Sequence, residues 1–428
     1  MSESSCNLSG VALVMSDFLD LVNPKLSGHH RSVAYIAMSV AERLGLPSES
    51  KEDIILASLT HDIGALSVAD RMEALDFEFV DADSHARAGS RLIAACAPLS
   101  GVADIVARHH EWHDSFVKSG VDADIALSAS IVHLADRVSI LLNDSSEPLS
   151  QRKKIIEKIS KRAGGMFNPR VAAAFIEESR REAFWFGTLP EFRDSAIARF
   201  VSENGDVDLS TADMLDVAKL FCRIIDYRSS FTAAHSAGVA ACASAIGGCL
   251  GLPNHEKARL ETAGYMHDIG KMAVPSSLIE KRGGLADEEF NIVKSHAFYT
   301  YHLLDKLPCF SVVRDYAAMH HEKINGNGYP FKLKGGEIPT GARIVAVADV
   351  FTALSEDRPF RKALALDDTI KTIDEMASDG SLDGDITRAL KSNLSLVDSA
   401  RAKAQRAAIF EYRSFEDGRG IIAHSASA

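Results

Sequence analysis

The 428-residue sequence contains no long apolar run. No stretch approaches the roughly 18 to 20 consecutive apolar residues that a membrane-spanning helix requires. Residues 1–26 also lack the basic start and the small-residue cleavage site of a signal peptide. The sequence therefore predicts a cytoplasmic protein that has no membrane partner.

Positive charge is also in deficit, since 47 Lys and Arg stand against 59 Asp and Glu, for a formal net charge of −12. A protein that coats duplex DNA needs a basic surface, so duplex nucleic acid is not an expected partner. A small anionic substrate held by a few local cations remains open. The six cysteines form no CxxC pair and no metal-ligand spacing, so we expect most of them to be reduced core residues.

What the sequence does contain is apolar material for two helical domains. Hydrophobic residues make up 46% of the chain and charged residues 25%, which is typical of soluble globular proteins. Apolar residues recur at helical spacing at Val33, Ile36, Val40 and Leu44, and again at Val239, Cys242, Ile246 and Leu250. Each series is followed by a glycine and a proline, which end helices. Alternating strand patterns are scarce, so the sequence predicts an all-α protein.

Histidines repeat in the same order in two parts of the chain. The interval from His29 to His61 equals that from His235 to His267, and Leu-Gly-Leu-Pro recurs inside it at 44–47 and 250–253. Further matches pair His61-Asp62-Ile63-Gly64 with His267-Asp268-Ile269-Gly270, His85 with His296, His109-His110-Glu111 with His320-His321-Glu322, and Ala135-Asp136 with Ala348-Asp349. A repeat of domain size predicts two copies of one domain.

The repeated residue types are those of a reactive metal site. Imidazole and carboxylate groups without thiolates suit iron, manganese or zinc. Neighbouring residues on a helix point about 100° apart, so His267-Asp268 and His320-His321 converge most easily on two adjacent ions. Two ions about 3.5 to 4 Å apart are the usual apparatus for phosphoester cleavage. The second copy therefore predicts a dinuclear site for that chemistry.

Three features of the second copy have no counterpart in the first. Lys271 follows Asp268 by three positions, which places its ammonium to hold a substrate phosphate, whereas the first copy has Ala65 there. Residues 325–330, Asn-Gly-Asn-Gly-Tyr-Pro, predict a tight loop. Arg358 and Arg361 can grip phosphate with two hydrogen bonds each. The two copies are therefore not expected to be equally active.

The second copy resembles the HD-GYP family of HD-superfamily phosphohydrolases, bacterial phosphodiesterases of cyclic di-GMP and related cyclic dinucleotides. The resemblance rests on residues 267–271, the stretch from His320 to Pro330, and residues 348–351 and 357–359. The first copy resembles a plain HD domain without the lysine and the GYP loop. The resemblance implies tandem HD-domain helical bundles, a degenerate HD domain over 1–148 and an HD-GYP catalytic domain over 206–395. Between them, a charged segment, a Gly-Gly break and an aromatic patch predict a helical connector over 149–205, and the Gly/Ser/Ala-rich end of the chain predicts a C-terminal tail over 396–428.

The resemblance also implies an activity and its residues. A metal-bridging hydroxide would open a cyclic dinucleotide, with cyclic di-GMP as the family default, to a linear dinucleotide and further to mononucleotides. Two divalent ions, iron or manganese, would be held by His235, His267, Asp268, His296, His320, His321 and Asp349. Asp268 would bridge the ions and act in catalysis with Lys271, while Lys271, Arg358 and Arg361 would contact substrate phosphate. A family member with a third ion uses a Glu where this chain has Phe231, so two ions are expected.

The GYP loop and the first copy leave alternatives open. Tyr329 either packs on its own domain or contacts substrate or a partner, and Asn325 replaces the usual Asp of the loop. The first copy keeps a possible second metal set, the alternative being a relic that now packs the domain: His29, His61, Asp62, His85, His109, His110 and Asp136. A homodimer and a GGDEF-type protein bound through the GYP loop are further expected partners.

Two other functions compete with cyclic di-GMP hydrolysis. The first is a 3′,3′-cyclic GMP-AMP phosphodiesterase of the same mechanism, because members with this layout of two copies and no receiver domain act on that substrate. The second, from another class, is a non-catalytic cyclic dinucleotide sensor that signals through the first copy. A nucleoside-triphosphate hydrolase of the wider superfamily is disfavoured by the GYP loop.

Overall fold

The computed structural model describes residues 7–21, 28–65, 83–143, 146–203, 209–227, 234–281, 283–357 and 362–418. Within these ranges the chain forms α-helices and short 3-10 helices, and its only β pairing is an isolated bridge between Ala163 and Phe167. The predicted all-α fold is therefore confirmed. Among the helices so described, none has the length and apolarity needed to cross a membrane.

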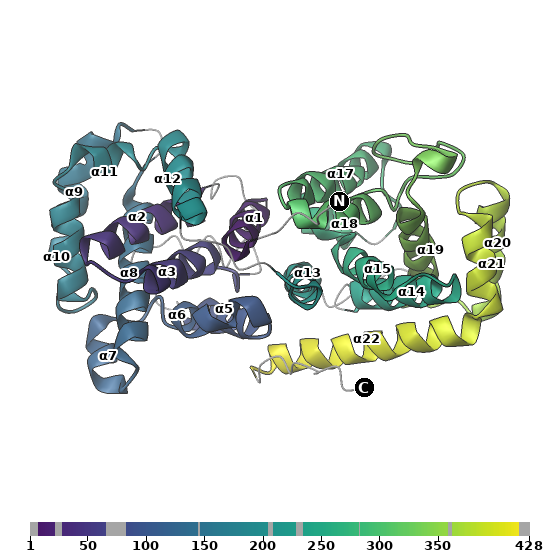
Figure 1. Ribbon diagram of the computed structural model, residues 1–428, viewed down its shortest axis with the longest axis horizontal. Coiled ribbons are helices and arrows are strands. Elements are labelled where there is room, and N and C mark those ends of the chain that lie inside the picture. The colour runs from purple at the N-terminus through teal and green to yellow at the C-terminus, as the bar shows by residue number, and fades with distance from the viewer. Residues whose placement is uncertain are drawn as a thin grey trace. The chain divides into compact units, whose positions relative to one another are not determined.

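The described residues up to Glu203 form one compact unit and those from Leu209 onward form another (Figure 1). The first unit contains α1 (Leu8–Asp20), α2 (His29–Arg43), α3 (Ser48–Thr60), α5 (Asp83–Ala94), η2 (Ala97–Val102), α6 (Ala103–Ala107), α7 (His113–Ser119), α8 (Ala123–Leu141), α9 (Pro148–Ser160), α10 (Pro169–Glu178), α11 (Glu182–Phe186) and α12 (Pro190–Glu203).

The second unit repeats much of this order. It contains α13 (Thr211–Asp226), α14 (His235–Cys249), α15 (Asn254–Met266), η3 (Ile269–Ala273), α16 (Ser276–Ile279), α17 (Asp287–Asp305), η4 (Pro308–Phe310), α18 (Ser311–Ala318), η5 (Gly335–Glu337), α19 (Thr340–Leu354), α20 (Leu366–Ser378), α21 (Gly384–Ser392) and α22 (Leu394–Glu416). By sequence match, α14, α15 and α19 correspond to α2, α3 and α8.

Helices α2 and α14 begin at corresponding histidines, and each is followed two residues after its end by a corresponding glycine. Gly45 and Gly251 have φ angles of 68° and 74°, the left-handed conformation in which glycine commonly ends a helix. Each is followed within two residues by the proline that precedes the next helix, α3 or α15. The helix ends predicted from Leu-Gly-Leu-Pro are therefore confirmed.

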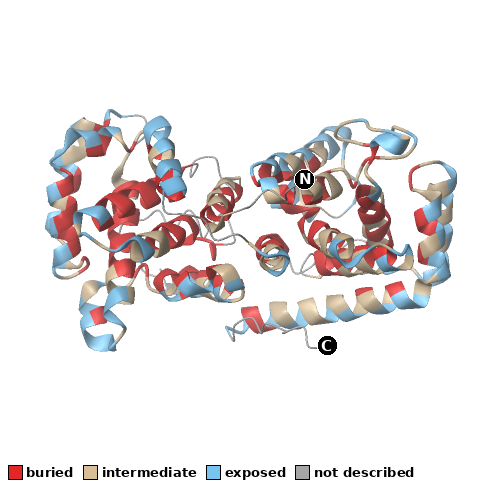
Figure 2. Ribbon diagram, in the orientation of Figure 1, coloured by how far each residue is buried: buried red, intermediate tan, exposed pale blue. Residues whose placement is uncertain are grey.

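The cores of the units form around α2 and α14 (Figure 2). Helix α2 packs on α3 and α8, and α14 packs on α15, α19 and α22. The predicted apolar stripes are fully buried at Val33, Ile36, Val40, Val239, Cys242 and Ile246. The last residue of each stripe differs, since Leu44 is half-buried and Leu250 is 37% exposed. Both follow the end of their helix, so they leave its buried face.

The segments outside the two copies are also helical. The described part of the predicted connector, residues 149–203, forms α10 to α12 and all but the first residue of α9 within the first unit. Helix α10 packs on α2 and α8, and α12 packs on α2. The prediction of a tail from residue 396 needs correction, because α22 continues to Glu416 and packs along α14. Val397 and Phe415 are buried, which gives the helix a reason to dock. Residues 419–428 lie outside the described ranges.

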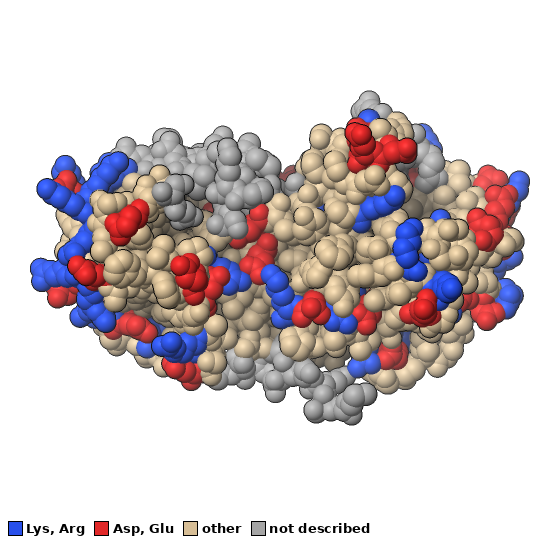
Figure 3. Space-filling view, turned by 90° about the horizontal axis from the view of Figure 1, so that it is seen from above, with Lys and Arg blue, Asp and Glu red and all other residues tan. Residues whose placement is uncertain are grey.

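Charged side chains are spread over the surface of each unit. On the face shown in Figure 3, basic and acidic side chains are interspersed. Many ion pairs are local, such as Arg180 with Glu177 and Arg259 with Glu256. Exposed pairs of this kind contribute little to stability, so the electrostatic features that bear on function are those at the histidine clusters.

Candidate dinuclear metal centre

The seven predicted ligands of the second unit come from the ends and interiors of several helices. His235 begins α14, His267 directly follows α15, Asp268 precedes η3, His296 lies within α17, His320 and His321 follow α18, and Asp349 lies within α19. Their candidate ligand atoms form three overlapping groups, each within 4.8 Å. The groups are His296/His320/His321, His235/His267/Asp268 and His267/His320/Asp349. The structure thus brings together all seven residues.

Asp268 lies between the groups. Its Oδ2 is 3.1 Å from His267 Nε2, and its Oδ1 is 3.5 Å from His296 Nε2. On the far side of His267, Asp349 Oδ1 is 3.1 Å from His235 Nε2. Ligand atoms that share one ion at about 2.1 Å lie roughly 3 to 3.5 Å apart. The spacing therefore fits an ion on either side of Asp268.

The imidazole rings of this cluster are held by the backbone. Nδ1 contacts a carbonyl oxygen in His267 (Gly264, 2.7 Å), His296 (Val293, 2.5 Å) and His320 (Ala317, 2.6 Å). A carbonyl only accepts, so each Nδ1 donates and Nε2 keeps the lone pair that a metal needs. Those three Nε2 atoms and Asp268 Oδ1 are buried without a hydrogen-bond partner. Such atoms are rare in proteins, so the donor set fits divalent cations.

The protonation states of His296, His320 and Asp268 also suit metal binding, whereas at His235 the effect of burial is outweighed by the carboxylates of Glu356 and Asp349, which raise the pKa to about 10. Burial lowers the pKa of His296 to about 4 and that of His320 to about 3. Burial alone would raise the pKa of Asp268, but His267 and Lys271 hold it well below its ordinary value. The Lys271 ammonium contacts Asp268 Oδ2 directly. Neutral imidazoles and an ionised carboxylate are the forms that ligate metals.

A glycine brings the helix of the third histidine onto each site. A Cβ at Gly270 would overlap the carbonyl oxygen of His296, and a Cβ at Gly64 would overlap that of His85. Only glycine allows this close approach of two backbones. The glycine of each His-Asp-Ile-Gly motif therefore allows the backbone of His296 or His85 to lie close to the motif.

The predicted tight loop at 325–330 packs against the ligands. Gly326 has a φ of 82°, and Asn325 Nδ2 donates to the carbonyl of Asp379 at 3.0 Å. The Glu322 carboxylate accepts from the backbone N–H groups of residues 331 and 333 at 2.6 and 3.1 Å. The Tyr329 ring lies 4.7 Å from the His321 ring. The predicted phosphate contacts Arg358 and Arg361, like Phe231, lie outside the described residues.

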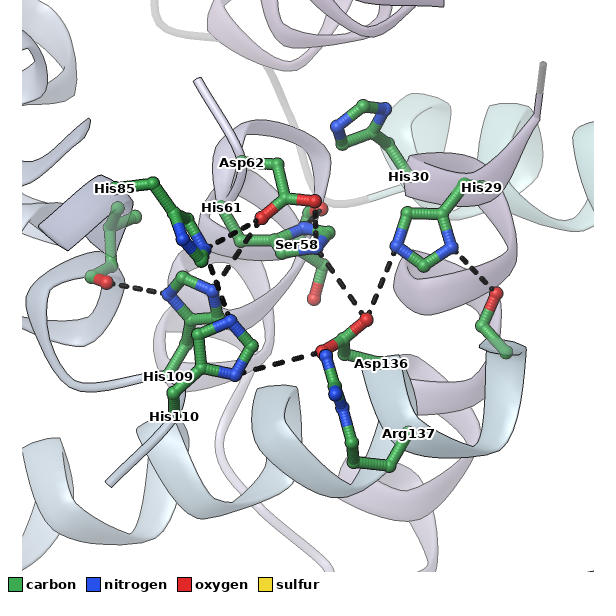
Figure 4. A network of polar contacts seen from close by, with 12 residues as sticks. His29, His30, Ser58, His61, Asp62, His85, His109, His110, Asp136 and Arg137 are labelled. Atoms are coloured by element: carbon green, nitrogen blue, oxygen red, sulfur yellow. Dashed lines mark hydrogen bonds and ion pairs between the residues drawn. The ribbon is translucent and has the colours of Figure 1, made fainter. Parts of the chain in front are cut away.

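The first unit assembles an equivalent cluster from its own seven residues (Figure 4). Their ligand atoms form two groups, Asp62/His85/His109/His110 and His29/His61/Asp136. Asp62 Oδ1 is 3.2 Å from His85 Nε2 and 3.7 Å from His109 Nε2. Nδ1 of His61 and of His109 lies 2.8 and 2.7 Å from a backbone carbonyl. The first copy thus retains the ligand geometry as well as the ligand types.

A buried arginine distinguishes the first cluster, and sequence reasoning missed it. Arg137 is 2% exposed, and its Nη2 and Nε lie 2.5 and 3.0 Å from Asp136 Oδ2. Figure 4 shows the guanidinium pointing into the cluster. The second copy has Val350 at this position. The repeat contained the signal, because Arg137 directly follows a predicted ligand.

A carboxylate distinguishes the second cluster, and it too was missed. Glu356 Oε1 lies 2.8 Å from His235 Nδ1. In the first cluster, the corresponding His29 Nδ1 lies 3.1 Å from the Ser139 hydroxyl. The one sequence clue is that Glu356 follows Asp349 by two helical turns.

Comparison with known proteins agrees with this duplication. Residues 26–141 and residues 219–386 each match a model described as HD domain. The 3'3'-cGAMP-specific phosphodiesterase 1 of Vibrio cholerae is 27% identical over 393 residues, which are 90% of this chain and 91% of that protein. The cyclic di-GMP phosphodiesterase response regulator RpfG of Xanthomonas campestris is 40% identical over 147 residues, 34% of this chain and 39% of that protein.

A solved structure supports the fold independently. The crystal structure of a V. cholerae cyclic GMP-AMP specific phosphodiesterase, V-cGAP3, aligns with a TM-score of 0.62 at 21% identity. The alignment covers 92% of this chain and 99% of that chain. This likeness in fold covers both helical units, and the two domain matches show that the chain contains two HD domains in tandem.

Proposed function

We propose that the second HD domain hydrolyses a phosphodiester bond of a cyclic dinucleotide and uses two divalent ions, iron or manganese. The observation that carries this proposal is the pair of ligand groups around Asp268, whose buried Nε2 atoms lack hydrogen-bond partners. The phosphodiesterase of V. cholerae that is similar over 90% of this chain supports the substrate class.

The residues divide into holders of the ions and contacts of the substrate. His235, His267 and Asp349 would hold one ion, His296, His320 and His321 the other, with Asp268 between them. Bound divalent ions supply a nucleophile at neutral pH and offset the charge of phosphoryl oxygens. The Lys271 side chain, 24% exposed, would hold a substrate phosphate oxygen. Tyr329 would line the site beside His321, and Arg358 and Arg361 would add cations.

Two cyclic dinucleotides are candidate substrates of the second domain. Cyclic di-GMP is the first candidate, supported by the 40% identity of the X. campestris phosphodiesterase over part of this chain. The second is 3′,3′-cyclic GMP-AMP, and the relative that covers nearly the whole chain favours it. Both molecules offer the same kind of phosphodiester bond to the ions, so contacts with the bases decide between them.

The first HD domain is proposed to hold metal without turning over substrate. Its group Asp62, His85, His109 and His110 offers four candidate ligand atoms within 4.8 Å. Ala65 takes the position of Lys271, and the guanidinium of Arg137 is buried against Asp136. At the position of Lys271, the first domain therefore offers no cation to a substrate phosphate.

The proposed partners other than substrate are a second copy of the chain and a GGDEF-type protein at loop 325–330. Both follow from the family resemblance alone and remain predictions. Light scattering coupled to size-exclusion chromatography tests the first. Binding to a purified GGDEF domain, with Tyr329→Ala as the loop variant, tests the second.

The proposed function is tested with a panel of substrates. The purified chain, loaded anaerobically with Fe(II) or Mn(II), is incubated with each cyclic dinucleotide, and products are separated by chromatography. A linear dinucleotide is the expected product. If no metal condition gives product while a cyclic dinucleotide still binds, the chain is a sensor and the proposed enzyme activity is wrong.

A further inference from the structure

A continuous series of side chains joins the C-terminal helix α22 to the first ligand of the second cluster. Arg401 Nη1 donates to Gln405 Oε1 at 2.6 Å, and Gln405 Nε2 donates to Glu356 Oε2 at 2.8 Å. The other oxygen of Glu356 lies 2.8 Å from His235 Nδ1, close enough for an ion pair but without hydrogen-bond geometry. Beyond the ring, His235 Nε2 lies 3.1 Å from Asp349 Oδ1. The series therefore ends inside the candidate metal centre.

The chemistry of each member fixes the direction of the series. Arginine only donates, so Arg401 determines which end of the Gln405 amide is the oxygen. The amide nitrogen then faces Glu356, which receives it as an acceptor. The carboxylate behind Nδ1 favours a proton on that nitrogen, which leaves Nε2, beside Asp349, as the nitrogen directed toward the cluster. The side chains of His235 and Glu356 are only 6% and 13% exposed, so water competes little for the contact between them.

The backbone of α14 is shaped to admit this series. Gly238 lies one turn after His235, and a Cβ there would stand 2.8 Å from Thr352 Cγ2 and 2.9 Å from Gln405 Nε2. Real Cβ atoms essentially never approach neighbours so closely. An alanine at 238 would therefore displace the ends of the Gln405 and Thr352 side chains from these positions.

The first HD domain lacks this arrangement. Ser139 supplies the contact at His29 Nδ1, and Asn143 stands at the position that corresponds to Glu356. In the second domain the equivalent of Ser139 is Thr352, whose hydroxyl is directed to Cys242 at 3.6 Å. The carboxylate at this place is thus specific to the domain with the complete set of site residues.

We infer that Glu356 is a positioning residue of the metal centre, and that Gln405 makes α22 part of its support. Glu356 holds the His235 ring with Nε2 toward the ion, and Gln405 holds Glu356. The inference rests on the metal centre proposed above. Partners of this kind, behind a ligand histidine, typically change metal affinity or activity 10- to 100-fold when removed.

The experiment measures metal affinity of the full chain rather than activity alone. The protein is stripped with a chelator and titrated with Mn²⁺ or Co²⁺ against a competing chelator. Glu356→Ala should weaken one ion of the second domain by about 10- to 100-fold and leave the ion at His296, His320 and His321 unchanged. Glu356→Gln, which keeps an acceptor but loses the charge, should fall in between. The Co²⁺ absorption spectrum should change with Glu356→Ala.

Two variants leave Glu356 in place and remove its support. Gln405→Ala and Gly238→Ala should each weaken the same ion, by less than Glu356→Ala does. The matched control is Glu411→Gln, since Glu411 pairs with Arg223 at 3.1 Å and joins α22 to α13 without reaching a ligand. It should leave metal affinity unchanged. Denaturation of the metal-free proteins shows whether any variant has lost its fold.

The outcomes separate this inference from the proposed function. If the wild-type chain binds no divalent ions in the second domain, both fail. If it binds two ions and Glu356→Ala binds them with wild-type affinity and spectrum, the positioning role is wrong while the metal centre stands. If Glu356→Ala does not fold, unchanged affinity in both Gln405→Ala and Gly238→Ala overturns the inference instead.

Discussion

The two HD domains bring together the same seven candidate ligands, five histidines and two aspartates, and they differ in the charged groups that contact those residues. In the second domain, Lys271 contacts Asp268 and Glu356 contacts His235. In the first domain, Ala65 replaces the lysine and Arg137 contacts Asp136. The difference lies in the surroundings of the ligands, because the ligands themselves have been retained.

These surroundings change the charge that a metal ion would meet. Among the contacting groups, the second cluster has three carboxylates and one ammonium, and the first has two carboxylates and one guanidinium. Divalent ions in a buried site are stabilised by negative ligands and opposed by nearby cations. The second domain is therefore better suited to two ions. A duplicated domain can keep its ligands and still lose the setting they need.

The largest expected effect is that of metal removal. Since the proposed nucleophile depends on divalent ions, treatment with a chelator should abolish hydrolysis of the cyclic dinucleotide. Addition of Mn²⁺ or anaerobic Fe²⁺ should restore it. Chromatography of the reaction products before and after each step provides the measurement. Full turnover by protein shown to be metal-free would contradict the proposal that hydrolysis depends on divalent ions.

Lys271→Ala should have the next largest effect. It removes the cation next to Asp268 that is proposed to hold the phosphate, so kcat/KM should fall by about 10²-fold. The converse change in the first domain, Ala65→Lys, should give no added activity, because Arg137 still occupies Asp136. Steady-state kinetics give kcat/KM for the two variants. An equal change in kcat/KM for both would contradict the proposed difference between the domains.

Arg137→Val gives the first domain the residue that the second one carries. In metal-free protein it leaves Asp136 buried without its guanidinium, which should cost about 3–5 kcal/mol of unfolding free energy. Added Mn²⁺ should recover part of this loss. The control is Arg108→Ala, which breaks the more exposed pair with Glu111 and should cost less than about 1 kcal/mol. Equal losses of unfolding free energy for the two variants in urea denaturation would contradict the proposal that the buried Arg137 stabilises the first cluster.

A smaller effect is expected on the pH dependence of the unfolding free energy, because the first domain has a buried histidine, His133, where the second has Ala346. Burial lowers the pKa of His133 to about 3, whereas an unfolded histidine has a pKa of about 6.5. The unfolded chain therefore binds the proton more readily, so this contribution to stability is present above pH 6.5 and is lost as pH falls toward 3. His133→Ala copies the second domain, which has Ala346. Its unfolding free energy, measured in chelator from pH 8 to 5, should fall less steeply than that of wild type.

The duplication and the helix ends could be predicted from the sequence because they depend on local signals. Gly45 and Gly251 end their helices through their own conformation, and the repeated order of histidines marks both clusters. Features of this kind can be predicted from the order of residues in the sequence alone. The exposed Leu250 shows the limit, since periodicity alone does not say where the buried face of a helix ends.

Arg137, Glu356 and α22 could not be predicted in the same way, because their roles depend on tertiary contacts. An arginine after an aspartate is usually a solvated residue, and only the fold buries Arg137 against Asp136. Gln405 lies far along the chain from His235, and their connection through Glu356 requires α22 to pack on α14. The predicted tail was wrong over residues 396–416 for the same reason.

The central claim is that catalysis belongs to the second domain although both domains keep their ligands. The most direct test compares Asp268→Ala with Asp62→Ala in the metal-loaded full chain and follows the linear dinucleotide by chromatography. The account predicts that Asp268→Ala loses about 10³-fold or more in kcat, while Asp62→Ala retains most of the wild-type rate. Comparable losses in both variants, or a larger loss in Asp62→Ala, would contradict it.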